Sequence, residues 1–378
     1  MEAIEVELAV VGGGLLGLAA ARELGRRGHE VLLMERDEIG NERAGSKGTA
    51  RVFRLGYDDP FYVHMAVCSK PMWRELEAES DRALLETTGQ LSFGQNLEQL
   101  RDAMTSAGAP VIGIDPAEVA IRAPGLNVGG PALFEPESGV LAADRCLAAL
   151  RVSCESAGVE VREHTQVTSM ADDGRRVSLD TEHSGTVSAS AAVVCAGHWT
   201  AGLVGQAGVG LRLSSRLEQV AYMTAVTGHD LQVPIFIERT DPWLYGLPCG
   251  PRGLFEPGLS EPGVLKVALH GAGPVAHPDD SPLDADPKQL SRLAEQCARL
   301  LSGYHQRPTS TERCFYDSSP DGDFVLDRVG RIVIGAGTTG HGFKFGPLLG
   351  ELLADLTVGA SPRFDLERFS ARRPSVCL

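Results

Sequence analysis

The sequence predicts an α/β protein with two parts, a domain with a parallel sheet that begins at the N-terminus and an α+β domain built on a large, mostly antiparallel sheet. A short apolar run ending at Val11 is followed by a glycine-rich turn, an Ala/Leu-rich segment to Leu24 and a second apolar run. This is the strand, helix, strand order of a parallel unit. Residues 211–269 show short apolar runs separated by Pro and Gly, which indicates strands of a second sheet. The length of 378 residues accommodates two or three domains.

Glycines in the first turn have the spacing of a nucleotide-binding loop. Gly12, Gly14 and Gly17 form G-x-G-x-x-G, and Glu35 closes the second strand. The first glycine permits the tight turn, the second lets a pyrophosphate approach the backbone, and the third lets helix and strand pack closely. The helix N-terminus offers N–H groups to the phosphates, and the acid accepts hydrogen bonds from a ribose. The sequence therefore predicts a Rossmann-like domain that binds an adenine dinucleotide, since a plain α/β turn would not need the acid in register.

Composition excludes several classes of partner. The net charge of −15 argues against a nucleic-acid partner, which requires a basic surface. Residues 1–5 are acidic where a secretory signal has a basic region, and no apolar run is long enough and free enough of glycine to span a bilayer. The eight cysteines include no C-x-x-C pair, so neither a disulfide framework nor a metal site is indicated. We therefore expect a reduced, cytoplasmic protein with no membrane association and no metal.

Hydrophobic periodicity defines the remaining elements. Residues 193–199 form a buried strand that breaks at glycine and should return to the first sheet. Cys195 and His198 are interpreted as core residues, because no metal-ligand spacing surrounds them. Helices are expected at 60–79, 96–107, 142–158 and 284–303 and from 342 to 356, and further strands at 87–94, 159–162, 166–170 and 331–334.

The neighbours of four basic residues in the sequence bear on whether each is buried or exposed. Only five of the 35 basic residues are lysines, and Lys266 and Lys344 lie among apolar residues, which is uncommon for a solvated lysine. Lys344 follows a second glycine cluster at 335–342, which lacks a following strand with an acid. We interpret this cluster as a strand-loop-helix unit whose N–H groups face something electron-rich, not as a second dinucleotide site. Without further context, Arg51 and Arg54 are interpreted as exposed arginines.

Four separated segments together resemble the monomeric sarcosine oxidase family, which includes N-methyl-amino-acid and pipecolate oxidases within the D-amino-acid oxidase-like flavoenzymes. The segments are 12–35, 45–57, Lys266 with His270, and Cys314-Phe315-Tyr316 followed by residues 340–345. Their order resembles the family across nearly the whole chain, and the last segment is the most specific. The resemblance implies an FAD-binding domain of the glutathione-reductase type and a separate substrate domain. We expect the FAD domain to comprise 1–82, 143–210 and 314–378, and the substrate domain 83–142 and 211–313.

The resemblance also implies roles for individual residues. Cys314 matches the position that attaches FAD covalently through a thioether, Arg51 lies over the flavin, and Lys266 promotes reaction with O₂ because a fixed cation stabilises developing superoxide. Arg54 and Lys344 match the pair that grips the substrate carboxylate, Tyr245 and Tyr316 the hydroxyls that line the cavity, and His270 a polar neighbour. The residues expected to bind the cofactor are Gly12, Gly14, Gly17, Glu35, Arg36, Ser46, Lys47, Val167, Cys314, Gly340, Gly342 and Lys344.

The activity implied is oxidation of a secondary amino acid, N-alkyl or cyclic, by a monomeric enzyme. Hydride transfer to flavin N5 gives an imine, and O₂ reoxidises the flavin to give H₂O₂. The chain departs from the family pattern at Lys47, where histidine is usual, at Ala50, where threonine is usual, and at Leu55-Gly56, so the substrate within this class stays open.

Several alternatives share parts of this pattern. They are a glycine- or D-amino-acid-oxidase-like enzyme, a biosynthetic imino-acid oxidase and a flavin dehydrogenase that uses a carrier instead of O₂. A flavin hydroxylase would need NAD(P)H, for which the sequence shows no separate site. A non-catalytic dinucleotide-binding protein is the alternative of another class, but it leaves Cys314, Lys266 and Lys344 unexplained together.

Overall fold

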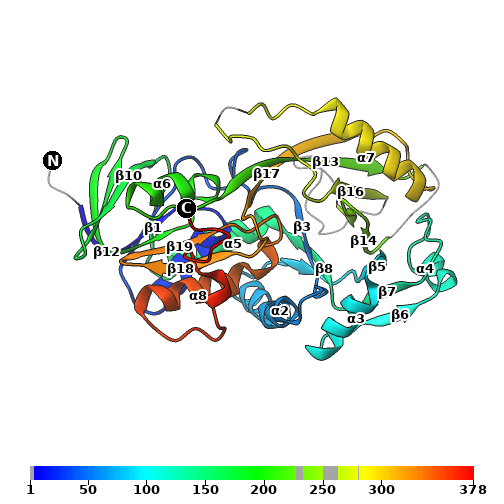
Figure 1. The fold of residues 1–378 in the computed structure, drawn as a ribbon, viewed down its shortest axis with the longest axis horizontal. Helices are drawn as coiled ribbons and strands as arrows, with labels where there is room; N and C mark the ends of the chain where they lie inside the picture. Colours follow the sequence, from blue (N-terminus) through cyan, green and yellow to red (C-terminus); the bar gives the residue numbers. More distant parts are fainter. Residues whose placement is uncertain (1–3, 227–232, 250–262, 280) are drawn as a thin grey trace.

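The computed structural model describes residues 4–226, 233–249, 263–279 and 281–378. Two large sheets lie side by side, each forming the centre of one half of an elongated molecule (Figure 1). The first described residues, which begin at Ile4, and the C-terminus both lie in the half built on the first sheet. The fold class predicted from the sequence is confirmed.

In the described part of the chain, the first sheet has eight strands and a parallel centre. Strands β9, β2, β1, β12 and β19 follow one another in parallel, while the β10–β11 ribbon and β18 pair antiparallel at the edges. The long β12 pairs with β11 along its first half and with β19 along its second half. The strands are β1 (Ile4–Val11), β2 (Val31–Met34), β9 (Glu160–Arg162), β10 (Val167–Asp172), β11 (Val177–Thr181), β12 (Gly185–Val194), β18 (Val325–Val329) and β19 (Ile332–Ala336).

Both faces of this sheet are covered, as expected for parallel strands. Along β1, Leu8 and Val10 enter the core shared with α1, α2, α5 and α8, whereas Ala9 and Val11 enter the core on the side of α6. The helices of this half are α1 (Leu15–Arg26), α2 (Pro60–Ser80), α5 (Ala143–Ser156), α6 (Thr200–Gln206) and α8 (Gly346–Val358), with the short 3₁₀ helices η1 (Gly197–Trp199), η2 (Phe343–Phe345) and η3 (Glu367–Phe369).

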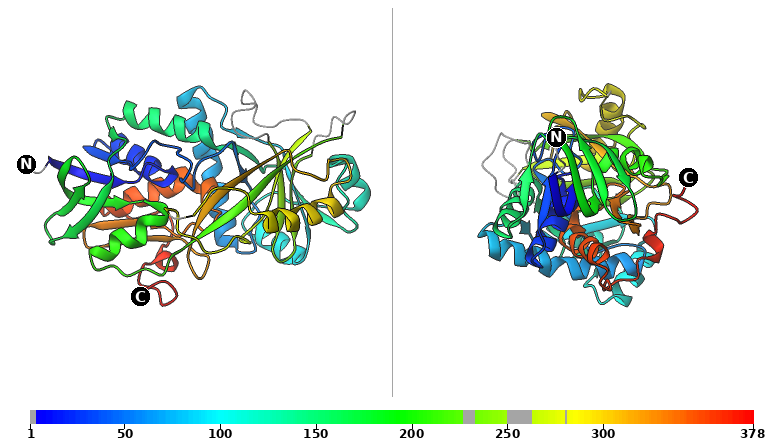
Figure 2. Two further views of the ribbon diagram at one scale, coloured as in Figure 1. Left: turned by 90° about the horizontal axis from the view of Figure 1, so that it is seen from above. Right: turned by 90° about the vertical axis from the view of Figure 1, so that its left-hand side faces the viewer.

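Within the described residues the second sheet also has eight strands, in the order β17-β13-β16-β15-β14-β5-β7-β6, and of these only β14 and β5 are parallel neighbours. The long strands β13 and β17 lie side by side and reach from one half of the molecule to the other (Figure 2). The strands are β5 (Gln90–Gly94), β6 (Ile112–Ile114), β7 (Ala132–Glu135), β13 (Ser214–Thr224), β14 (Ile235–Arg239), β15 (Leu244–Pro248), β16 (Val264–Leu269) and β17 (Ser310–Ser318).

The remaining elements connect or cover the sheets. A small sheet, β3 (Ala50–Phe53), β8 (Gly139–Ala142) and β4 (Leu85–Glu86), joins segments that are distant in sequence. Helices α3 (Leu97–Ser106), α4 (Pro116–Arg122) and α7 (Pro287–Leu300) lie in the second half. Among the described residues, no helix is long and apolar enough to cross a membrane.

Most expected elements are present, with boundaries that local chemistry explains. The helix expected at 284–303 begins at Pro287 because Asp286 caps it and proline favours the first helical position. The strand expected from residue 87 begins at Gln90, after the positive φ of Gly89. Within the strand region predicted at 211–269, residues 227–232 and 250–262 lie outside the described part of the chain. The division of the chain into sequence ranges for two domains stays a prediction.

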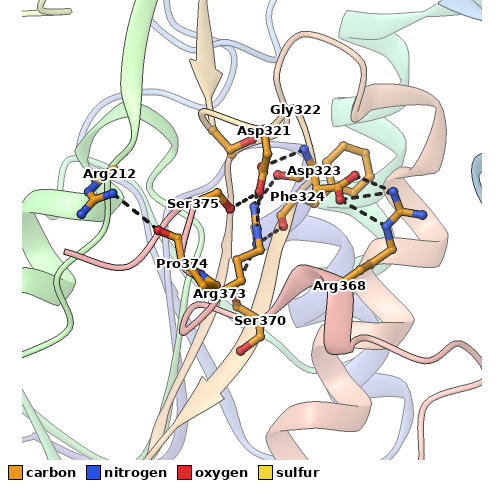
Figure 3. Close-up of polar contacts among 12 residues, drawn as sticks. Arg212, Asp321, Gly322, Asp323, Phe324, Arg368, Ser370, Arg373, Pro374 and Ser375 are labelled. Atoms are coloured by element: carbon orange, nitrogen blue, oxygen red, sulfur yellow. Dashed lines mark hydrogen bonds and ion pairs between the residues drawn. The ribbon is translucent and has the colours of Figure 1, made fainter.

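The C-terminal segment is fixed against the turn that precedes β18 (Figure 3). The Arg373 guanidinium forms an ion pair of 2.7 Å with the Asp321 carboxylate, and the Arg368 guanidinium forms one of 2.8 Å with the Asp323 carboxylate. The turn between them contains Gly322, whose carbonyl faces the interior of the molecule and accepts a hydrogen bond from His341. The chain terminus therefore helps to hold a turn that contacts the candidate active site.

Candidate active site

A cavity of about 410 Å³ lies at the carboxyl ends of the parallel strands β1, β2, β12 and β19. This is where dinucleotides bind in open α/β sheets. Gly12 has a φ of +102°, and a side chain at this position would come within 2.5 Å of the Cys195 carbonyl oxygen. A Cβ at Gly17 would lie 1.9 Å from the Gly12 carbonyl oxygen. Glycine is therefore required at both positions, in the turn and where α1 approaches it.

Polar groups around the turn are arranged for a phosphate and a ribose. Ser46 accepts a hydrogen bond of 3.1 Å from the N–H of Leu15 at the start of α1. The Glu35 carboxylate accepts bonds from the N–H groups of Gly13 (2.6 Å) and Asp37 (3.1 Å), which fixes its position at the cavity wall. Burial raises the pKa of Glu35, while these two N–H groups oppose the rise.

Eight of the twelve residues predicted to bind the cofactor line this cavity. Of the other four, Cys314 and Lys344 line a second cavity next to it, and Gly17 and Lys47 line neither. Gly17 lies beneath the turn, and Lys47 is absent from the lining because its buried ammonium forms an ion pair with Glu42. His198, interpreted from the sequence as a core residue, instead lines the cavity, and its Nδ1 lies 3.2 Å from the Ser215 hydroxyl. The predicted cofactor residues that line it are Gly12, Gly14, Glu35, Arg36, Ser46, Val167, Gly340 and Gly342.

The edge of this cavity contains a contact between the two halves. The Arg36 guanidinium lies 4.8 Å above the Trp199 ring and forms an ion pair of 2.8 Å with Asp279. The other oxygen of Asp279 accepts a hydrogen bond of 2.9 Å from the Trp199 indole. Arg36 therefore lies at the edge of the cavity, and its role in binding the cofactor stays a prediction.

A second cavity, of about 90 Å³, adjoins the first. The two share Arg51, Tyr316, Gly340 and Phe343 in their linings. Trp243 and His341 also line the second cavity, although neither was predicted from the sequence to be a site residue. The residues predicted to contact substrate or to act in catalysis all line it: Arg51, Arg54, Tyr245, Lys266, His270, Tyr316 and Lys344. Cys314, predicted to attach the cofactor, lines it too.

Two cations face this cavity from separate segments. The Arg54 guanidinium, half-buried rather than exposed, donates to the Gly56 carbonyl and stacks 3.9 Å above the Tyr57 ring. The Lys344 ammonium donates to the Tyr57 hydroxyl (2.9 Å) and to the His341 carbonyl (2.7 Å). Burial lowers the pKa of Lys344, and the charge of Arg54 lowers it further. No carboxylate is within ion-pair distance of either cation among the described residues, so both remain available to an anionic ligand.

The titratable groups around these cations are held neutral. Burial lowers the pKa of His270 to about 4, with further contributions from Arg54 and Lys344. Burial and Lys344 likewise lower the pKa of His341. Tyr245 and Tyr316 are joined by a hydrogen bond, and burial raises the pKa of Tyr245 to about 12. The cavity thus combines fixed positive charge with neutral donors and acceptors.

A second group of charges lies where the two cavities meet. Lys266, on β16, is buried, and its ammonium donates to the Ala50 carbonyl at 3.3 Å. Burial lowers its pKa, as does the nearby Arg51, whose guanidinium lies 5.6 Å above the Phe343 ring. Cys314, on β17, is half-buried; burial raises the pKa of its thiol, whereas Arg51 and Lys266 act in the opposite direction.

Several proteins of named activity are similar to this chain over nearly its whole length. The chain is 28% identical to monomeric sarcosine oxidase of a Bacillus species, with 98% of this chain and 96% of that protein aligned. It is 29% identical to peroxisomal sarcosine oxidase of Mus musculus, covering 96% and 95% of the two chains. It is 26% identical to N-methyl-L-tryptophan oxidase of Citrobacter koseri, covering 98% and 99%.

Solved structures share the fold over the whole chain. NikD, described as an unusual amino acid oxidase essential for nikkomycin biosynthesis, superimposes with a TM-score of 0.84 at 26% identity, covering 99% of this chain and 98% of NikD. Glycine oxidase from Geobacillus kaustophilus superimposes with a TM-score of 0.81 at 22% identity, covering 98% and 99% of the two chains, a likeness that concerns the fold.

A family profile described as "FAD dependent oxidoreductase" matches residues 7–356. The first cavity fits that cofactor: glycines leave room beside the N-terminus of α1, where a pyrophosphate would bind, and the Glu35 carboxylate faces the place of a ribose. The adjoining cavity would then be next to the flavin ring, with Arg51 in the linings of both cavities and Lys266 in the lining of the second. The chain belongs to the family of FAD-dependent oxidoreductases.

Proposed function

We propose that this enzyme oxidises the C–N bond of a secondary amino acid, N-alkyl or cyclic, and passes the electrons to O₂. The observation that carries the proposal is the placement of Arg54 and Lys344 in one small cavity that adjoins the dinucleotide cavity. Two relatives that align over nearly the full chain are named for oxidising N-methyl amino acids, namely sarcosine and N-methyl-L-tryptophan. The products would be an imine and H₂O₂.

The substrate would be held by its carboxylate. Lysine has three ammonium protons, of which Lys344 uses two on Tyr57 and His341, so one remains for the ligand. Arg54 can supply a planar donor pair to the same carboxylate. Apolar and aromatic side chains on the remaining walls, including Ile237 and Leu247, would contact the carbon skeleton. Trp243 and Tyr245 complete this part of the cavity.

The reaction would not depend on a strong base from this chain. His270 is neutral above about pH 5, and the charged groups beside it are cations. Because these cations disfavour a second positive charge on the substrate, the amine would enter in its neutral form. Bound FAD supplies the acceptor for the hydride equivalent and the means of reducing O₂. Lys266, a buried cation, would stabilise the negative charge that develops on oxygen.

We propose further that Cys314 attaches the flavin covalently. Cys314 lines the second cavity; burial raises the pKa of its thiol, and the positive charges of Arg51 and Lys266 oppose this rise and so favour the thiolate that such an attachment needs. We also propose a monomeric enzyme in the cytoplasm, with the FAD and substrate domains divided at the boundaries predicted from the sequence. The relative from a Bacillus species is itself named as monomeric.

The test begins with the absorbance spectrum of the purified protein before and after acid precipitation. Flavin that stays with the precipitated wild type and is released from Cys314→Ser would establish the attachment. H₂O₂ formation is then measured with sarcosine, N-methyl-L-tryptophan and pipecolate, with glycine and a D-amino acid as primary-amine comparators. Turnover of the primary amines alone would overturn the proposed substrate class. Rapid reduction by a secondary amino acid with slow reoxidation by O₂ would instead identify a dehydrogenase.

A further inference from the structure

Tyr57 links the two cations of the candidate carboxylate site. The face of its ring lies 3.9 Å from the Arg54 guanidinium, and its hydroxyl oxygen lies 2.9 Å from the Lys344 ammonium. The side chain is 8% exposed and lines neither cavity. One buried residue therefore contacts both groups that would grip the substrate without being positioned to touch the substrate itself.

His341 fixes the direction of the hydrogen bonds around this hydroxyl. Its Nε2 lies 3.2 Å from the Gly322 carbonyl, which can only accept, so Nε2 carries the proton. The ring is neutral, because burial and Lys344 lower its pKa, and Nδ1 is therefore an acceptor. Nδ1 lies 3.4 Å from the Tyr57 hydroxyl, which donates to it and keeps its own lone pairs toward Lys344. The order of donation runs from Lys344 to Tyr57 to His341 to Gly322.

The ring of Tyr57 is itself held by aromatic neighbours. Its ring packs against Tyr62, with centroids 5.3 Å apart, and against Phe345 at 5.9 Å. His341 in turn packs against Phe324 at 4.8 Å, in the turn that the C-terminal segment holds (Figure 3). Because these contacts already hold Tyr57 in one position, little further conformational entropy is lost when a ligand binds.

We propose that Tyr57 is a positioning residue that sets the separation and orientation of Arg54 and Lys344, and that His341 orients its hydroxyl for this purpose. The inference rests on the proposed function, because it assumes that these two cations bind a carboxylate. The ring controls Arg54 by stacking, and the hydroxyl controls Lys344 by accepting a hydrogen bond from its ammonium. The two contributions can therefore be removed one at a time.

The test compares variants of the holoenzyme, with acetate as the probe and flavin absorbance as the signal. Tyr57→Phe keeps the ring and removes the hydroxyl, so we expect the Kd for acetate to rise roughly tenfold, the size of a lost hydrogen bond to a charged group. Tyr57→Leu also removes the ring face and should weaken binding further. In steady-state assays with a secondary amino acid, KM should rise while kcat at saturation changes less.

Tyr62→Phe is the matched control. It removes a hydroxyl from the same aromatic group, but this hydroxyl donates to Asp323 at 2.9 Å and does not touch Lys344. Acetate affinity should therefore be unchanged, even if the melting temperature falls. If Tyr57→Phe does not fold, His341→Leu replaces it as the deciding variant, because it removes the acceptor of the Tyr57 proton and should also weaken acetate binding.

The outcomes separate this inference from the proposed function. Wild-type enzyme that binds no acetate and oxidises no amino acid would overturn the substrate class and this inference together. Wild-type enzyme that binds acetate, with Tyr57→Phe within twofold of it, would overturn the role of Tyr57 alone. A loss of affinity as large in Tyr62→Phe as in Tyr57→Phe would show a general packing effect and would also overturn it.

Discussion

The carboxylate of Glu135 accepts a hydrogen bond of 3.0 Å from the backbone N–H of Gly56, so a residue on the second sheet fixes the turn that carries Arg54 and Tyr57. Glu135 is completely buried and also accepts from Ser138 (2.8 Å) and Gln90 (2.7 Å). A Cβ at Gly56 would lie 2.5 Å from one oxygen of this carboxylate. Glycine at this position, which departs from the family pattern, is thus matched to a buried acid.

Replacing Glu135 by alanine should destabilise the protein strongly. The change leaves several buried donors without an acceptor, at about 1–3 kcal/mol for each unsatisfied group. We expect the free energy of unfolding of Glu135→Ala to fall by about 3 kcal/mol or more, measured by urea unfolding. Glu137→Ala is the control, because its carboxylate is half-exposed and its one ion pair among the described residues is with Lys70, a contact of about 0–1 kcal/mol. Equal losses in both variants would contradict this account.

Gly56→Ala tests the same relationship from the other side. The added Cβ meets the Glu135 carboxylate at 2.5 Å and Leu100 at 3.1 Å, and overpacking of this kind costs about 1–3 kcal/mol. Because Arg54 donates to the Gly56 carbonyl, the shift should also weaken acetate binding. Gly113→Ala has open space at its Cβ and is the control for adding a methyl group to a glycine. Unchanged acetate affinity in Gly56→Ala would show that the turn does not position Arg54.

Acetate binding should weaken as the pH rises, and this loss should begin at a pH below the pKa of an ordinary lysine. Burial and Arg54 lower the pKa of Lys344, so its positive charge is present at low pH and is lost as pH rises through the lowered pKa. Arg54→Met removes one cause of the lowering, and the alkaline limit of acetate binding should therefore move to higher pH even though binding is weaker overall. A titration of Kd against pH measures both effects. A limit that stays in place would contradict the coupling between the two cations.

His270 should contribute no ionisation between pH 6 and 9. Its pKa is lowered to about 4 by burial and by two neighbouring cations, so it is neutral throughout this range. We expect His270→Gln to change the magnitude of kcat/KM without moving either limb of its pH profile. The displacement of a limb in this variant would show that His270 titrates during turnover.

Some residues of the site could be predicted from the sequence and others could not. The glycine turn, Glu35 and the two buried lysines could be identified because their neighbours along the chain already indicate turn, strand or burial. Tyr57 and Trp243 could not be selected, since their importance depends on Arg54, Lys344 and a hairpin that meet only in the folded chain.

Two other residues show why the motif alone was insufficient. Lys47, predicted to bind the cofactor, has its ammonium paired with Glu42 and outside the lining of either cavity; its assigned role stays a prediction. His198 was interpreted as core because no metal-ligand spacing surrounds it, yet it lines the larger cavity. A nucleotide cavity needs side chains of the right shape at strand ends, and this requirement leaves little periodic signal in a sequence.

Lys266→Met should separate the two halves of the catalytic cycle. The ammonium of Lys266 is buried beside Arg51 and Ala50, where a fixed charge interacts more strongly with a developing anion than it would in water. We expect reoxidation of the reduced enzyme by O₂ to slow by about 100-fold or more, the effect of removing one preorganised stabilising group, while anaerobic reduction by substrate changes much less. Stopped-flow absorbance of the flavin measures the two steps independently. Lys288→Met, at the start of α7, controls for the loss of a positive charge outside the cavities. Equal slowing of reduction and reoxidation in Lys266→Met would show that Lys266 supports the structure of the site instead of the reaction with oxygen.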